Sequence, residues 1–149
     1  MDREPEPLLG TSHFRVLIGK RELGFCEVGR VSSVTDLEAP PEARAHSFET
    51  LVLRRALTRS TELFDWRRKI LAGSDDRRPV TIQQLDAPTG VVMNTWRLEG
   101  AWPCRWSGPT FDAGQTAIAY EELELAFDDL IWQAEGSPRS TSPPTTEGD

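Results

Sequence analysis

Apolar and polar residues alternate along most of the middle of this chain, which is the pattern of β-strands with one buried face. The alternation is clearest near the end of the patterned region, where Leu123, Leu125 and Phe127 are expected to face inward and Glu122 and Glu124 outward. The segments predicted as strands are 13–18, 23–28, 31–37, 48–57, 80–85, 91–98, 105–108 and 116–127. We expect 116–127 to be the longest of them.

Turn residues predict how these strands connect. Gly19-Lys20 is suited to a tight turn, so residues 13–18 and 23–28 are expected to form a hairpin that 31–37 continues. The segment 86–90 contains Pro88 and Gly90 and predicts a second hairpin. Two prolines interrupt the pattern between residues 38 and 46, because proline cannot donate to a strand ladder.

One segment, at about residues 60–72, has helical periodicity instead. Leu63, Trp66 and Ile70 share one face, Ser60 is placed to cap the first turn, and Gly73 is a natural stop. Asp65 and Lys69 are four residues apart and are expected to pair on the outer face. The fold class predicted is therefore mainly β, a barrel or sandwich with one flanking α-helix.

Composition divides the chain into three zones. Residues 1–11 are polar and proline-containing and are expected to form a flexible leader, and 12–133 carry the β domain. Residues 134–149 are rich in Pro, Ser and Thr and have almost nothing to bury, so we expect a disordered tail. The N-terminus lacks the apolar stretch of a secretory signal, which favours synthesis and folding in the cytoplasm.

Charge and chemistry exclude several functions. The formal net charge of −7 argues against direct nucleic-acid binding, which needs clustered Lys and Arg. The two cysteines, Cys26 and Cys104, are expected to be buried thiols, and neither histidine has companions at metal-ligand spacing. We therefore expect no metal and no cofactor. An enzyme would have to use a carboxylate pair, and the candidates for it are Asp112, Glu121, Glu122 and Asp128. Surface solubility explains these acids better, so no catalytic residue is expected.

Three segments are more specific than the general β pattern, and they are 60–69, 101–109 and 118–127. In their order and spacing they resemble the tail tube proteins of contractile phages and of phage-derived extracellular injection systems, over residues 12–132. The resemblance implies a fold related to the type VI secretion tube protein. It also implies hexameric rings that stack into a hollow tube inside a sheath, with baseplate and cap proteins at its ends and cargo in its lumen. Such a particle meets a membrane only as the target of the assembled tube, and it can be released from the cell.

Candidate subunit-interface residues lie in two of these segments. They are Asp65, Arg67, Arg68, Trp102, Arg105 and Trp106. The alternatives are plain core packing for the tryptophans and a solvated helix face for the charged residues. Glu121, Glu122 and Glu124 either line the lumen or form the outer face of a strand.

One departure from the family pattern leaves two possible places for the chain within the tube. The family has a long Gly-containing hairpin after its second strand, whereas residues 36–47 here are short, contain prolines and are partly acidic. The chain is therefore either the repeating tube unit or a specialised ring at the baseplate or cap end. A small ligand-binding β-barrel is the alternative of another class, although the bulky inward residues argue that the interior is filled.

Overall fold

The computed structural model describes residues 8–44 and 46–135. Within them the chain forms ten strands, one α-helix and one 3-10 turn, η1 (Pro41–Ala43). The strands are β1 (Phe14–Ile18), β2 (Arg21–Leu23), β3 (Glu27–Val28), β4 (Ser33–Thr35), β5 (His46–Phe48), β6 (Leu51–Ala56), β7 (Arg78–Leu85), β8 (Val92–Ser107), β9 (Tyr120–Ala126) and β10 (Asp129–Ala134). The α-helix is α1 (Glu62–Leu71). The mainly β fold with one helix is confirmed.

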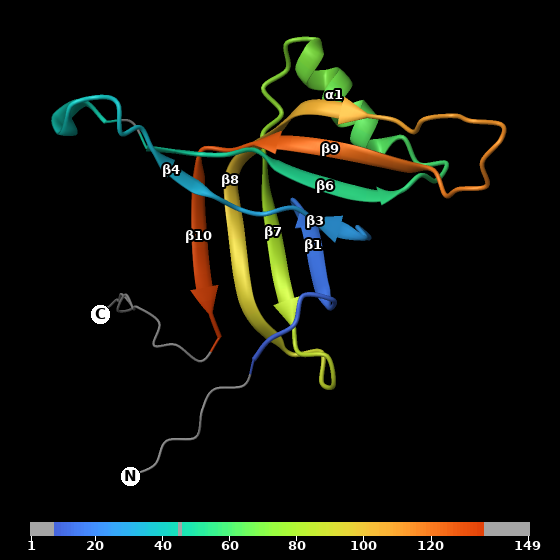
Figure 1. Ribbon diagram of the computed structural model, residues 1–149, viewed down its shortest axis with the longest axis horizontal. Coiled ribbons are helices and arrows are strands. Elements are labelled where there is room, and N and C mark those ends of the chain that lie inside the picture. The colour runs from blue at the N-terminus through green and yellow to red at the C-terminus, as the bar shows by residue number, and fades with distance from the viewer. Residues whose placement is uncertain (1–7, 45, 136–149) are drawn as a thin grey trace, which may run out of the picture.

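Two antiparallel sheets share the long strand β8. Its first part pairs with β7 and β10 in a lower sheet of order β2-β1-β7-β8-β10, of which β1, β7, β8 and β10 stand side by side in Figure 1. Its second part pairs with β9, which continues to β6 and β3 in an upper sheet. The strand changes sheets at Gly100, where φ is +67°. Glycine adopts this left-handed backbone region without the steric cost that a side chain would bring.

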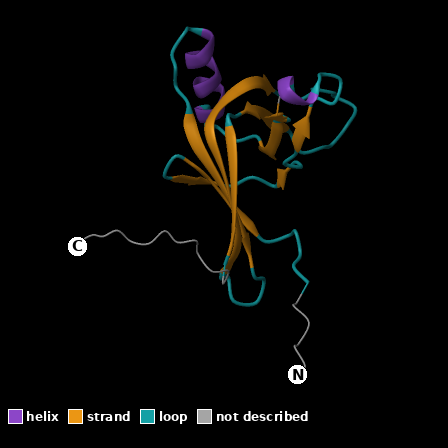
Figure 2. Cartoon of the chain, turned by 90° about the vertical axis from the view of Figure 1, so that its left-hand side faces the viewer, coloured by secondary structure: helices purple, strands orange, loops and turns teal. Residues whose placement is uncertain are grey.

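The core lies between the two sheets and beneath the helix. Leu98 from β8, Leu53 from β6 and Leu123 from β9 are fully buried there. Trp66 covers this core from α1, which contacts β8 at the upper end of the molecule (Figures 1 and 2). The face of α1 predicted from the sequence is therefore the buried one.

A short hairpin of β4 and β5 projects away from this body. It forms the arm at the left of Figure 1, opposite the long 108–119 loop at the right. The expectation that 31–37 continues the first hairpin is wrong, because β4 pairs with β5. The predicted strand 23–28 is also wrong as one unit. Only β2 pairs with β1, whereas β3 crosses to pair with β6.

The other strand predictions need three corrections. The predicted strand 48–57 is not one unit, because β5 ends at Phe48 and β6 begins at Leu51 with a different partner. Residues 105–108 are not a separate short strand, because β8 continues through Pro103 to Ser107. A register shift between Pro103 and Arg105 shows that a bulge accommodates the proline, which cannot donate to a regular ladder. The longest strand is therefore β8, and β9 begins only at Tyr120.

The N-cap of the helix lies one residue later than predicted. Thr61 occupies the N-cap position, and Ser60 only accepts a 3.4 Å hydrogen bond from the amide of Glu62. Asp65 takes a 2.9 Å hydrogen bond from the Thr61 hydroxyl instead of pairing with Lys69. The helix ends before Gly73, whose φ is +94°, as predicted.

The outer zones of the chain fall largely outside the described residues. Of the expected leader, residues 1–7 lie outside them. Of the expected tail, β10 includes Ala134, and 136–149 lie outside them.

Candidate assembly surfaces

A buried ion pair ties the helix to both neighbouring strands of the upper sheet. Arg55 on β6 is 6% exposed and Glu121 on β9 is 2% exposed, and the Arg55 Nε donates to Glu121 Oε2 at 2.8 Å. Arg55 Nη1 also bonds Glu62 of α1 at 3.1 Å, and Arg21 reaches the same carboxylate at 3.2 Å. Trp106 donates its indole N–H to Glu121 Oε1 at 2.8 Å. The pair therefore joins four elements at the base of the helix.

Sequence reasoning missed this role of Glu121 and Arg55. Glu121 neither lines a lumen nor lies on the outer face of its strand, because it points into the core. The signal was available, since Glu121 is in phase with the inward Leu123 and Leu125, and Arg55 is in phase with Leu51 and Leu53. Two opposite charges at inward positions of paired strands predict a buried ion pair.

Three of the six candidate interface residues lie against the helix or β8. The ring of Trp106 meets Phe64 of α1 edge to face, with centroids 4.9 Å apart. Arg67 donates from Nη1 to the carbonyl of Pro103 at 3.1 Å. Trp102 is half-buried, with the guanidinium of Arg77 6.0 Å from its ring centroid. Trp106 and Arg67 thus fasten the helix to the second part of β8.

The other three candidates are exposed. Asp65 and Arg68 lie on the outer face of α1, and Arg105 lies on β8 opposite Glu124. Arg68 sits 6.0 Å from the ring of Phe64. These three side chains are exposed, although Asp65 also accepts the hydrogen bond from Thr61, whereas Trp106 and Arg67 hold α1 against β8.

A second charged group lies near the C-terminal end of the helix. Asp76 accepts from Arg78 at 2.7 and 3.0 Å, and its backbone carbonyl accepts from the Trp66 indole at 2.7 Å. Lys69 lies 3.9 Å from the same carboxylate, which makes Asp76 its ion-pair partner in place of the predicted Asp65. The hydrogen bond from Arg78 holds the pKa of Asp76 below its ordinary value, against the opposing effect of partial burial.

The acids considered for catalysis have separate local roles. Asp112 accepts from the amide of Gly114 in a turn, Glu122 lies 3.8 Å from Arg54, and Asp128 pairs with Arg77 at 3.0 Å. Among residues 8–44 and 46–135 there is no group of three or more His, Cys, Asp or Glu side chains placed to hold a metal ion.

Both cysteines are free, and Cys26 is exposed, so the expectation that it is buried is wrong. Burial raises the pKa of the Cys104 thiol. In the described part of the chain no helix is both long enough and apolar enough to cross a membrane.

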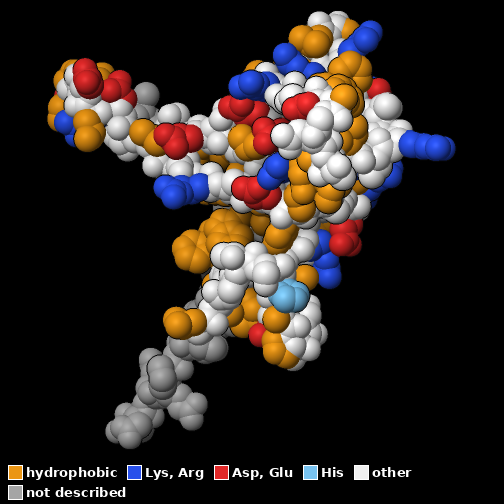
Figure 3. Space-filling view, turned by 45° about the vertical axis from the view of Figure 1, so that its right-hand side comes forward, with side chains coloured by type: hydrophobic (Ala, Val, Ile, Leu, Met, Phe, Trp, Pro, Cys, Tyr) orange, Lys and Arg blue, Asp and Glu red, His pale blue; other side chains and the backbone are white. Residues whose placement is uncertain are grey.

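The lower sheet has two edges without a neighbouring strand among the described residues. One is the outer edge of β10, at the left of the sheet in Figure 1. The other is the start of β1, because β2 covers β1 only from Val16 to Ile18. Hydrophobic side chains also show at the surface between the upper part of the molecule and the lower sheet (Figure 3).

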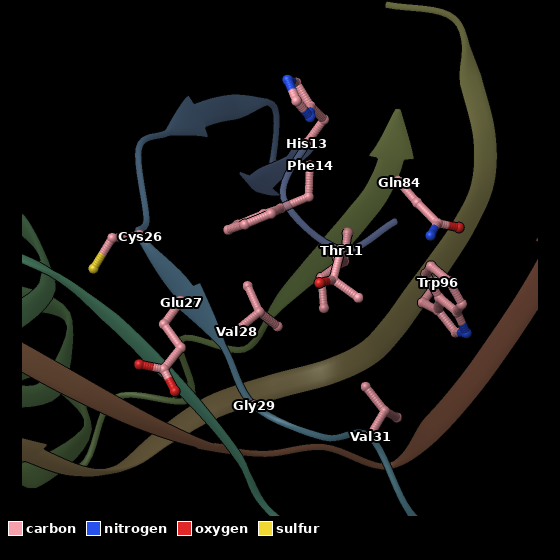
Figure 4. Close-up of a pocket in the computed structure, with 11 residues that line it drawn as sticks. Thr11, His13, Phe14, Cys26, Glu27, Val28, Gly29, Val31, Gln84 and Trp96 are labelled. Carbon is pink, nitrogen blue, oxygen red and sulfur yellow. The ribbon is translucent and has the colours of Figure 1, made fainter. Parts of the chain in front are cut away.

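An open hollow of about 440 Å³ lies beside the β1 edge. Phe14 and Trp96 face it from the lower sheet, and Val28 and Val31 face it from the segment that crosses in front (Figure 4). Cys26 and Glu27 stand at its margin in the same view.

A comparison with known families decides what kind of protein carries these surfaces. Residues 10–131 match the sequence model of the T4-like virus tail tube protein gp19. The chain belongs to this tail tube protein family. The resemblance seen in the sequence is confirmed, and a tail tube protein is a structural protein. Among curated proteins, none matches this tail tube protein with significance.

Solved structures with the same fold agree with the family. A chain of the sheath–tube complex of an extracellular contractile injection system, PVC, in its extended state is 26% identical, with a TM-score of 0.71 over 87% of this tail tube protein and 93% of that chain. A chain of the PVC sheath/tube terminator is also 26% identical, with a TM-score of 0.70 over 87% and 99%. Hcp1 from Flavobacterium johnsoniae shares the fold at 13% identity, with a TM-score of 0.59 over 81% and 94%.

Proposed function

We propose that the chain is the subunit of the inner tube of a contractile phage-tail-like injection system. Six copies close into a ring, and the rings stack into a hollow tube inside a sheath. The ring is inferred from two features of the lower sheet. Two of its edges lack a neighbouring strand among the described residues, and the strands at these edges run in opposite directions. The match to a sheath–tube complex supports the sheath as the partner outside the ring.

Strand direction makes the two free edges complementary. β1, β7, β8 and β10 are antiparallel neighbours in that order, so β10 runs opposite to β1. A rotation about an axis along the strands preserves their directions. It therefore brings the β10 of one copy beside the β1 of the next in an antiparallel arrangement. A closed ring of such contacts leaves no edge of this sheet exposed.

Backbone groups at both edges point outward. Glu135 donates to the carbonyl of Met93, and bonded pairs alternate along an antiparallel ladder, so the amide of Trp132 faces away from β8. The amide of Leu130 already donates to Asp129 Oδ1 at 2.8 Å, so the Trp132 amide is the donor at the centre of this edge. On β1, the bonds of His13 and Gly19 to β7 place the amide of Phe14 on the outer side in the same way. Each edge offers donors and acceptors to a neighbouring strand.

The face of the lower sheet opposite the core would then line the tube. Across the strands it carries one row of Arg15, Gln83, Thr95 and Gln133, and another of Leu17, Thr81, Arg97 and Ile131. Arg15 is near Glu22, and Arg97 pairs with Glu99. A polar wall with balanced charges suits cargo that moves through the lumen without being held.

The exposed helix face is proposed as an outward surface of the ring. Asp65, Arg68 and Arg105 would contact a neighbouring subunit or the sheath there, while Arg67, Trp102 and Trp106 support the helix and β8 behind them. The domain limits stay as proposed from composition, with 12–133 as the β domain between a leader and a tail. The subunit would be made in the cytoplasm and leave it as part of a released particle.

A terminal ring at the baseplate or cap end is the second candidate. The chain is 26% identical both to a chain of the PVC sheath/tube terminator and to a chain of the sheath–tube complex. This equal similarity supports the terminal ring as an alternative. Co-assembly with the sheath protein separates the two. A repeating unit gives tubes whose length grows with the amount of subunit, whereas a terminal ring gives single rings at tube ends.

Native mass spectrometry of the purified chain tests the ring itself. The proposal expects a species of six times the 16.7 kDa mass of one chain. A monomer at every concentration, and in particular a monomer that retains a small molecule, would favour a ligand-binding barrel instead.

A further inference from the structure

Trp132 is a large aromatic side chain held rigidly at the surface of the β10 edge. It is 64% exposed, although it stacks on Trp96 with ring centroids 5.8 Å apart and planes 14° from parallel. Its indole N–H donates to Asn94 Oδ1 at 2.9 Å, and the amide of Asn94 is fixed in turn by Gln84 at 2.8 Å. One face of the ring is therefore held by the chain, and the other is presented outward in a fixed orientation.

Trp132 continues a row of apolar side chains across the core face of the lower sheet. In register, Val16, Ile82, Trp96 and Trp132 stand side by side on β1, β7, β8 and β10. Val16 and Ile82 are buried, and Trp132 at the end of the row is exposed. Nothing in the described part of the chain covers its outer face, so the row ends at the edge that the ring would join.

Phe14 occupies the matching place at the other edge. Its amide faces outward, and β2 leaves this part of β1 uncovered. Its side chain lies on the core face, the face that carries Trp132, and it forms a wall of the open hollow (Figure 4). A strand joining β1 here must pair with the stretch ahead of Val16, because β2 blocks the rest.

We propose that Trp132 is the anchor of the subunit seam and packs against Phe14 of the next copy, closing the open side of its hollow. This inference rests on the proposed ring and names the contact that holds it. An aromatic side chain already fixed by its own chain loses little conformational freedom on binding, and buried Trp residues are frequent hot spots of interfaces. Pairing across the seam also places the two side chains on the same face of the joined sheet.

A matched pair of substitutions tests the anchor. Phe111, in the loop that follows β8, is 85% exposed and lies outside both edges and outside α1, so Phe111→Ser removes another exposed aromatic side chain. We expect Trp132→Ser to raise the protein concentration of half-assembly at least about tenfold, and Phe111→Ser to leave it unchanged. Mass photometry across a dilution series gives these concentrations. Melting of the dilute subunits shows whether each variant is folded.

Amide exchange on the unmodified chain provides a test without any substitution. Slower exchange in the ring than in the dilute subunit is expected for segments 128–134 and 10–15, with no change for the loop at 86–91. Rings that form at the same concentration with Trp132→Ser, or that leave these two segments unprotected, would overturn the anchor and leave the ring intact. An unmodified chain that never forms rings would overturn the proposed function as well.

Discussion

At the scale of single residues, Arg55 and Glu121 are the charged side chains that the described fold buries, and they pair with each other. Both side chains are buried, and Arg55 Nη2 is buried without a hydrogen-bond partner among the described residues. Without Glu121, Arg55 keeps the partly buried Glu62 as a partner, but its Nε and the Trp106 indole lose their acceptor in a medium of low polarity, which costs more than the pair itself contributes.

Glu121→Ala is therefore expected to lower the free energy of unfolding by about 3 kcal/mol. Its neighbour Glu122 is exposed and lies 3.8 Å from Arg54, so Glu122→Ala should cost less than about 1 kcal/mol. Urea unfolding of the two variants measures the difference. Equal losses would show that Arg55 is satisfied by Glu62 alone.

Asp76 predicts a dependence of stability on pH. Because its pKa in the folded chain lies below its ordinary value of 3.8, the charged form favours folding. That contribution is complete above the unfolded pKa and is lost as the pH falls below it through the folded pKa. We expect Asp76→Asn to lose about 1 kcal/mol at neutral pH and to converge with the unmodified chain in acid.

Asp75 provides the control for that measurement. Its side chain is 86% exposed and pairs with Arg77, so Asp75→Asn should match the unmodified chain at every pH. Thermal melts between about pH 2 and pH 7 compare the three proteins. A constant gap between Asp76→Asn and the unmodified chain down to the lowest pH would refute the assigned role.

At the scale of elements, the shared strand β8 depends on Gly100. A Cβ at this position would collide with the carboxylate of Asp128, and its φ of +67° disfavours other residues. We expect Gly100→Ala to destabilise the chain by about 2 kcal/mol. Gly24→Ala is the control, because no atom lies within 4 Å of its added Cβ. Chemical unfolding that ranks the two variants equally would contradict this account of the bend.

Elements with clean periodicity could be predicted from the sequence, and the others could not. The apolar face of α1 and the hairpin of β7 and β8 followed from helical spacing and from the turn at 86–90. The strand β10 was missed because Leu130, Ile131 and Trp132 are consecutive apolar residues with no alternation. The continuity of β8 was missed because of Pro103. A proline normally interrupts a strand, and the bulge that accommodates this one leaves no mark in the alternation of apolar and polar residues.

The candidate interface residues stay predictions, and the sequence pattern does not sort them. Within segment 101–109, no pattern separates Trp106, which packs against the helix, from Arg105, which is exposed. That distinction depends on the fold, which brings α1 onto the second half of β8. The free edges of β1 and β10 likewise can be identified only from the strand order, which the sequence does not show.

At the scale of the whole molecule, two strand edges of the lower sheet are left uncovered by the described residues. Among these residues no strand lies beside the outer edge of β10 or the start of β1, and the exposed Trp132 lies on β10. Such edges invite uncontrolled pairing unless a specific neighbour covers them. A closed ring covers both edges with the same contact in every copy.

Electron cryo-microscopy of the full chain, alone and with its sheath protein, tests this claim most directly. The account predicts closed six-fold rings in which β10 of each copy is hydrogen-bonded to β1 of the next, around a central channel lined by the polar face of the lower sheet. Isolated compact subunits in every sample, or rings whose channel is bordered by α1, would contradict it.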